Sequence, residues 1–152
     1  MKKLVCIIFV LTFCSALNAQ DLKEADVPAI VKTNFISMYP NAKNVRWEKE
    51  HGNYEAEMGK GMDEISVIFN DRGTLIQTKT EISVSELPKG VSEYTSQNLR
   101  SKKINEATKI LSNSGIITYE AEIGNADFLF DADGKFIKKN SDSNENDNND
   151  NN

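Results

Sequence analysis

Apolar and acidic residues alternate strictly in two short segments, residues 54–58 and 119–123. Both segments read Tyr-Glu-Ala-Glu followed by one apolar residue and a glycine. A period of two is typical of a β-strand with one buried face. We therefore predict two half-buried strands in which the tyrosine and alanine face the core and both glutamates face solvent. Two copies of one signature in a short chain indicate an internal duplication.

The segment before the first signature predicts a helix. Apolar side chains recur there at helical spacing, Asp26 is placed to cap the first turn, and Pro40 disfavours continuation beyond Tyr39. Pro28 is acceptable in the first turn, whose amides have no partner within the helix. The predicted apolar stripe consists of Val27, Ile30, Val31, Phe35 and Met38.

Four strands are predicted to follow this helix. In the first, Val45 and Trp47 share a face, which favours a core position for Trp47. The signature forms the second strand. The third and fourth, over residues 64–69 and 74–82, are joined by an Asn-Asp-Arg-Gly turn whose glycine can adopt positive φ.

The same order of elements recurs after residue 84. Leu87 and Pro88 match Val27 and Pro28 at an offset of 60 residues. The strands predicted for this second copy cover residues 104–111, 119–123, 126–130 and 135–138. Neither copy can bury its apolar faces alone, so we predict an α+β fold in which two α-β-β-β-β repeats form one antiparallel sheet. This sheet should have about eight strands, with both helices on one face and the other face open.

Residues 1–19 have the pattern of a secretory signal peptide. Two lysines precede an apolar run, and small residues lead to a predicted cleavage site after about Ala19. The apolar run is shorter than the roughly 20 residues that span a bilayer, so we expect no membrane span in the mature protein. Cys14 raises the alternative of a lipoprotein, which Phe13 immediately before it disfavours. The expected location is periplasmic or secreted.

Charge and cysteine content narrow the chemistry of the remaining chain. Both cysteines, Cys6 and Cys14, lie in the predicted signal, which excludes a thiol nucleophile or thiolate metal site after cleavage. Residues 20–140 carry 16 basic and 19 acidic side chains, a net charge of −3 without a basic stripe, so nucleic acid is not an expected partner. Residues 141–152 contain only Asn, Asp, Ser and Glu and are predicted to be a disordered tail.

The domain expected from these patterns covers residues 26–140, with repeats at 26–83 and 85–140 and a polar lead-in at 20–25. Within it, the early proline of the first helix, the Tyr-Pro-Asn-Ala turn, the Val-Arg-Trp-Glu strand, the signature and the Asn-Asp-Arg-Gly turn together resemble PepSY-like, β-lactamase-inhibitor-like proteins. The resemblance implies an exported, non-enzymatic domain similar in architecture to the tandem-repeat β-lactamase inhibitor protein, which grips an enzyme with its open sheet face. The lack of cysteines and the acidic tail depart from that inhibitor, so a β-lactamase is not implied as the target.

The residues that could serve catalysis or metal binding also have ordinary structural interpretations. Paired carboxylates serve glycoside hydrolases, but no loop-built cleft is predicted beside these glutamates, so we expect no enzyme activity. The Asp-Ala-Asp-Gly segment at 131–134 lacks the later ligands of a calcium loop and reads as a turn, and His51 has no second imidazole to share a metal. No metal or cofactor is expected. The candidate binding residues, all predicted on the open sheet face, are Arg46, Glu48, Glu55, Glu57, Glu120 and Glu122.

The function that these patterns favour is a periplasmic binding module, inhibitor-like in kind, whose partner is an envelope protein, a peptidase or a peptide. The alternative is a structural or small-ligand-sensing envelope domain, and a hydrolase ranks third. The oligomeric state and the role of the acidic tail are open at this level.

Overall fold

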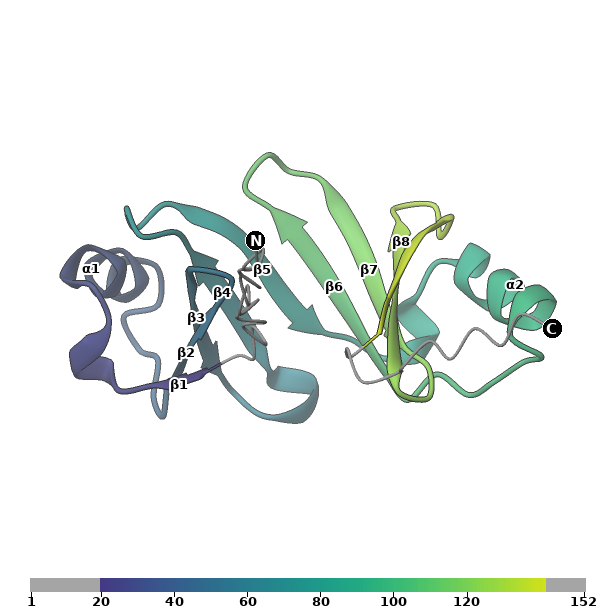
Figure 1. Ribbon diagram of the computed structural model, residues 1–152, viewed down its shortest axis with the longest axis horizontal. Helices are drawn as coiled ribbons and strands as arrows, with labels where there is room; N and C mark the ends of the chain where they lie inside the picture. The colour runs from purple at the N-terminus through teal and green to yellow at the C-terminus, as the bar shows by residue number, and fades with distance from the viewer. Residues whose placement is uncertain (1–19, 142–152) are drawn as a thin grey trace, which may run out of the picture.

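A computed structural model describes residues 20–141, and the predicted signal peptide and the residues after Ser141 lie outside the described range (Figure 1). Two α-helices, α1 (Ala29–Met38) and α2 (Lys89–Asn98), are each preceded by a short 3-10 turn. The strands are β1 (Gln20–Leu22), β2 (Arg46–Glu50), β3 (Asn53–Met58), β4 (Ile65–Phe69), β5 (Leu75–Glu81), β6 (Glu106–Ser112), β7 (Ile117–Glu122), β8 (Ala126–Asp131) and β9 (Phe136–Ser141).

The strands form one antiparallel sheet in which the spatial order equals the order along the chain. The predicted α+β fold of two tandem repeats is confirmed, with nine strands instead of about eight within the described residues. The additional strand, β1, lies where only a polar lead-in was expected. It pairs with β2 and places Leu22 opposite Trp47, and Leu22 packs against the first core.

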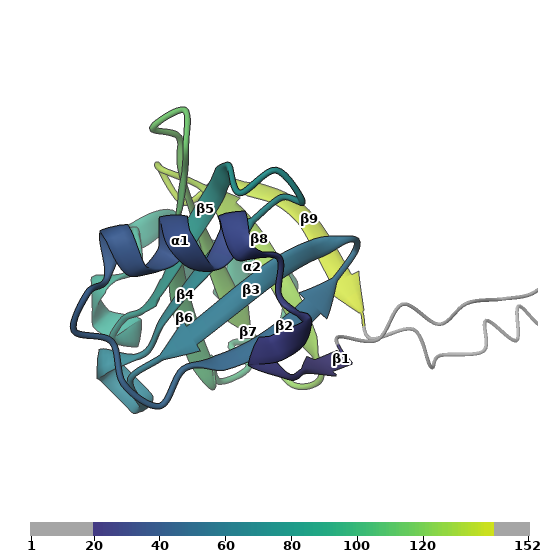
Figure 2. The ribbon, with the colours of Figure 1, turned by 90° about the vertical axis from the view of Figure 1, so that its left-hand side faces the viewer.

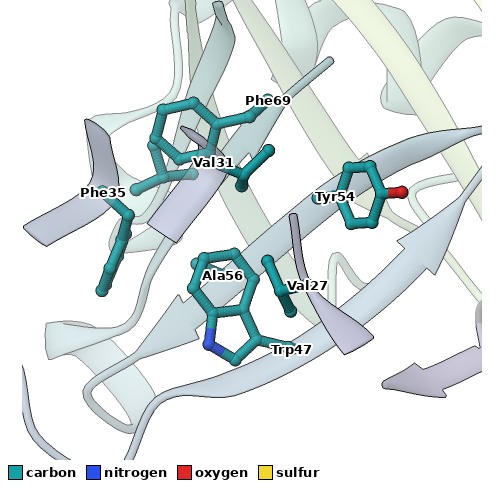
Figure 3. Packing of buried hydrophobic residues seen from close by; sticks show 8 residues of the cluster. Val27, Val31, Phe35, Trp47, Tyr54, Ala56 and Phe69 are labelled. Carbon is teal, nitrogen blue, oxygen red and sulfur yellow. The ribbon is translucent and has the colours of Figure 1, made fainter. Parts of the chain in front are cut away.

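The first core lies between α1 and strands β2 to β4 (Figure 3). Val31 and Phe35 of the helix are buried, and the Phe35 ring meets Trp47 edge-on with centroids 5.2 Å apart. Phe69 is fully buried on β4. Burial of such aromatic side chains supplies much of the stability of a small domain.

Two details of the predicted first helix were wrong. Asp26 does not cap α1: it ends a 3-10 turn, and Pro28, with φ of −55°, occupies the N-cap position. Because the helix begins three residues later than Asp26, Val27 reaches the core from extended backbone. Ile30 and Met38, predicted in the apolar stripe, are 49% and 43% exposed.

The second core repeats this arrangement between α2 and β7 to β9. Val91 and Phe130 are fully buried, and Tyr94 stacks on Phe136 with ring centroids 4.7 Å apart. Gly90 lies so close to the β8–β9 turn that a Cβ there would sit 2.7 Å from the carbonyl oxygen of Gly134. A side chain at position 90 would therefore force α2 away from its core.

The strand register places both cores on the same face of the sheet, as predicted. In Figure 1 the helices nonetheless lie at opposite ends of the molecule, with the strands between them. Figure 2 shows α1 lying across the strands of the first repeat. The sheet must therefore be strongly curved, because only then can helices on one face point away from each other. The face without helices is the inner one, and its two halves are turned toward each other.

Candidate functional site

The sheet face opposite the helices, here called the helix-free face, is dominated by carboxylates. The strand register, followed from β1 to β9, assigns every second side chain of each strand to this face. Its basic residues are Arg46, Lys79 and Lys138. Its acidic residues are Asp21, Glu48, Glu50, Glu55, Glu57, Glu81, Glu106, Glu120, Glu122, Asp127 and Asp131. A face this acidic, on a domain of net charge near −3, concentrates negative potential on one side of the protein.

Arg46 forms the centre of one cluster on this face. It lies directly opposite Glu57 in the β2–β3 register and pairs with that carboxylate. Its Nη1 lies 2.8 Å from Oε1 of Glu48 on the same strand. The pKa of Arg46 is raised, first by its hydrogen bond to Glu57 and then by the charge of Glu57.

The cluster also fits the geometry that could hold a cation. Carboxylate oxygens of Glu48, Glu55 and Glu57 lie within 4.8 Å of one another. The pKa of Glu48 is nevertheless raised, first by burial and then by the charge of Glu57, and Arg46 opposes that shift. The guanidinium of Arg46 thus already supplies positive charge to these acids.

Glu55 corrects one expectation from the sequence. It was predicted to face solvent, but only 5% of the residue is exposed. It lies on the helix-free face opposite Ile68, itself 8% exposed, and it accepts a hydrogen bond from the hydroxyl of Ser66. The ammonium of Lys79 lies 3.4 Å from Oε1 of Glu55. Its neighbours Ser66, Ile68 and Lys79 lie on the same face, and Glu55 is buried there even though no helix covers it.

Lys79 connects the two repeats electrostatically. Burial by itself lowers its pKa, but the charges of Glu55, Glu120 and Glu50 raise the pKa above its ordinary value of 10.5. The pKa of Glu120 on β7 is raised, first by burial and next by the charge of Asp127, while Lys79 opposes the shift. Glu50 on β2 also contributes to that shift, so charges five strands apart in the sheet act on each other across the concave face.

Two hollows open on the helix-free face. The first, called the seam hollow because it lies where the repeats join, has a volume of about 190 Å³. Its lining residues come from β3 to β7 and the turn before β4: Glu55, Glu57, Glu64, Ser66, Lys79, Glu81, Glu106, Thr108 and Glu120. The second hollow, about 170 Å³, lies toward the β2–β3 turn and shares Glu55 and Lys79 with the first. The Glu55–Lys79 pair therefore forms the wall between them.

All six candidate binding residues lie on the helix-free face, but the structure does not gather them into one site. Glu48, Glu55 and Glu57 lie close together beside Arg46. Glu120 lies across the seam hollow, which Glu55 and Glu57 also line. Glu122 is separate and accepts a hydrogen bond of 3.1 Å from the side chain of Asn105.

Several other residues of the face were missed from the sequence, among them Ser66, Lys79 and Glu106, which line the seam hollow. The polar positions Gln77, Lys79 and Glu81 alternate with period two along β5, which was a usable signal for the face. The contacts of each of these residues depend on how the strands pair. The sequence pattern of a single strand does not show that pairing.

The residues that could have served metal binding or catalysis have structural roles in the fold. Asp131 Oδ1 accepts hydrogen bonds from the backbone amides of Asp133 and Lys135, as expected of a turn. His51 lies in the β2–β3 turn with Nδ1 3.4 Å from Glu50. Trp47 and Tyr54 are in the first core, as predicted, and Tyr119 packs half-buried against the second. Within the described residues, neither α-helix has the length and hydrophobicity needed to cross a bilayer.

Comparison with known proteins identifies a family and a fold. The family described as "Putative beta-lactamase-inhibitor-like, PepSY-like" matches residues 16–77 and again residues 62–138. Among proteins with curated descriptions, none matches the chain.

Three solved structures with a similar fold, each from a Bacteroides species, illustrate the likeness. A "putative periplasmic" protein from Bacteroides eggerthii DSM 20697 aligns with TM-score 0.66 and 16% identity, covering 75% of this chain and 88% of that one. A DUF2874 family protein from Bacteroides uniformis ATCC 8492 gives 0.65 and 20%, covering 74% and 88%. A BLIP-like protein from Bacteroides fragilis NCTC 9343 gives 0.57 and 20%, covering 79% and 89%. At these identities the likeness establishes a shared fold.

Proposed function

We propose a function for this chain on the premise that it belongs to the PepSY-like, beta-lactamase-inhibitor-like family, whose pattern it carries twice. It is an exported, non-enzymatic binding module that recognises a protein or peptide through the helix-free face. The family description and the fold shared with a BLIP-like protein support an inhibitor-like role. The "putative periplasmic" description of a structural neighbour supports a periplasmic location, with residues 1–19 as the cleaved signal.

The observation that carries the proposal is the pattern of charge and shape on one face. The helices cover one side of the sheet, while the other side is concave, uncovered and lined by carboxylates with two hollows. Interfaces of this kind obtain specificity and rapid association from electrostatic complementarity, so a basic surface on the partner fits best. The carboxylates lie on strands, which hold them in fixed positions and lower the cost of ordering them on binding.

Capture experiments with matched charge variants test this proposal. The purified exported protein is immobilised and exposed to envelope extract of its source organism, and the retained proteins are compared among variants. The double variant Glu48→Gln/Glu120→Gln removes two charges from the helix-free face. Both residues have a raised pKa, so the folded state already disfavours their charges and should tolerate the amide.

The matched control is Glu24→Gln/Glu93→Gln, which removes two exposed charges outside the helix-free face, one in the turn before α1 and one on α2. A partner retained by the wild type and the control, and released from the face variant at lower salt, is the expected result. Equal retention by all three proteins would contradict binding through this face.

A second candidate function has its own observation. A hollow of about 360 Å³ lies beside α1, lined in part by Phe35, Tyr39 and Trp47. An aromatic pocket of this size would suit a small apolar ligand and a sensing role. Thermal shift of the protein with a panel of small molecules, compared with the variant Ile36→Glu at the pocket's edge, distinguishes this function from protein binding.

A further inference from the structure

The two repeats can be compared position by position on the helix-free face, because their strands pair in the same register. Glu57 of the first signature is equivalent to Glu122 of the second. Directly across the ladder, Glu57 is opposite Arg46, whereas Glu122 is opposite Glu106. The first repeat thus pairs its signature glutamate with a cation, and the second pairs it with another acid.

The same row differs further along the sheet. On the other side of Glu57 the first repeat has Ser66 and then Lys79. The equivalent positions of the second repeat are Asp127 and Asn140. Three acidic residues therefore occupy one row of the second repeat where the first repeat has one acid between two cations.

This row works against the stability of the sheet. Like charges directly opposite on neighbouring strands are destabilising. The pKa of Glu106 is raised, first by the charge of Glu122, then by burial and by Glu81, Glu64 and Asp127. Among residues 20–141, no lysine or arginine forms an ion pair with either Glu106 or Glu122. An arrangement that costs stability and is absent from the sister repeat suggests a use outside the fold.

The row is also accessible. Glu106 is exposed at the start of β6 and lines the seam hollow, and Glu122 is half-exposed at the end of β7. The first repeat shows which chemical group satisfies the signature glutamate, because there the guanidinium of Arg46, at the position equivalent to Glu106, contacts Glu57 and a second carboxylate, that of Glu48.

We propose that Glu106 and Glu122 form a seat for an arginine side chain of the protein partner, whose guanidinium supplies to the second repeat the positive charge that Arg46 supplies to Glu57 in the first. The planar, forked guanidinium can donate to two carboxylates at once, which an ammonium does less well. The proposal rests on the proposed function and names the feature of the partner that the helix-free face selects.

The test uses a defined peptide probe and a variant in which the protein's own side chain supplies the positive charge. The probe is a capped pentapeptide of glycine and serine with one central arginine, titrated into the ¹⁵N-labelled protein and followed by NMR. Wild-type protein should show its largest amide shifts at the start of β6 and the end of β7. Glu106→Arg, which reproduces the first repeat's pair, should weaken the probe's affinity by about tenfold or more, as for loss of a hydrogen bond to a charged group.

The control Glu93→Arg makes the same change of charge on α2 and should leave binding nearly unchanged. The equivalent peptide with lysine should bind more weakly than the arginine peptide. Equal affinity of Glu106→Arg and the wild type, or shifts confined to β2 and β3, would overturn the seat, and equal affinity for the lysine peptide would overturn its preference for guanidinium.

Capture of the partner separates this inference from the proposed function. A partner lost by Glu48→Gln/Glu120→Gln but retained at full strength by Glu106→Arg would refute the seat and leave the binding face intact. A partner retained by both variants would refute both proposals.

Discussion

Replacing Lys79 by methionine should destabilise the protein, although the side chain lies on a face without helices. Lys79 is the lysine within 4 Å of Glu55, and only 7% of the Glu55 side chain is exposed. Methionine retains the apolar stem that packs in the sheet and removes the charge, so the loss reports on the ion pair.

The size of the effect follows from burial of the two partners. Removing one partner of a fully buried pair costs about 3–5 kcal/mol, mostly because the other charge is left without compensation. Here 27% of the Lys79 side chain is exposed, and Ser66 still donates to Glu55, so we expect a loss of about 2–3 kcal/mol in the free energy of unfolding. The double variant Glu55→Gln/Lys79→Met should recover most of this loss, since it leaves no buried charge and keeps an acceptor for Ser66.

Urea denaturation followed by circular dichroism measures these differences, because a small single domain is expected to unfold in one step. Lys89→Met serves as the control: its side chain is 89% exposed and pairs with Glu93 on α2, and no measurable change is expected. A loss below about 0.5 kcal/mol for Lys79→Met, the range of ordinary surface changes, would refute the buried pair. So would a double variant no more stable than Lys79→Met.

Three further outcomes are expected. The pKa of Glu106 is raised chiefly by Glu122, and that of Glu120 chiefly by burial, both above the ordinary value of 4.5. An acid with a raised folded pKa contributes stability that is fully present below the unfolded value and is lost as the pH rises through the folded value. Urea midpoints should therefore decrease as the pH rises above 4.5. The variant Glu106→Gln/Glu120→Gln should show a smaller decrease, and an unchanged decrease would show that other groups cause it. Phe69→Ala should cost about 3–5 kcal/mol because the ring is fully buried, whereas Ile36→Ala, at a side chain 57% exposed, should cost far less, and the reverse order in denaturant melts would contradict the assignment of faces. Intact mass of the exported protein should correspond to a chain beginning after about Ala19, and a mass that includes Cys14 or an acyl group would contradict the predicted export signal.

The sequence predicted the sheet and its faces because those depend on local alternation. The repeated signature placed Ala56 and Ala121 in the cores and the four glutamates on the other face, as the register shows. Helix ends were less predictable. Asp26 and Pro28 are both residues that can precede a helix. Pro28 occupies the N-cap position of α1, where its fixed φ suits the extended backbone before the helix.

The features that give the helix-free face its character were not predictable in this way. Glu55 is buried beside Ile68 and Lys79, and Lys79 lies 24 residues away along the chain. The different partners of the two signature glutamates, Arg46 for Glu57 and Glu106 for Glu122, appear only when the strands are paired, because the turns after β2 and β6 differ in length. Local pattern thus identified which residues share a face, and pairing between strands decided which of them interact.

Binding of the partner to the helix-free face can be measured most directly by protection of single cysteines. The described residues contain no cysteine, so one introduced thiol reports on one position. Thr108→Cys places the thiol in the seam hollow, and Gln97→Cys places it on exposed α2. The rate of maleimide labelling is then compared with and without the captured partner. Slow labelling at position 108 and unchanged labelling at position 97 is the predicted result. Protection at position 97 with free labelling at position 108 would contradict binding through the helix-free face.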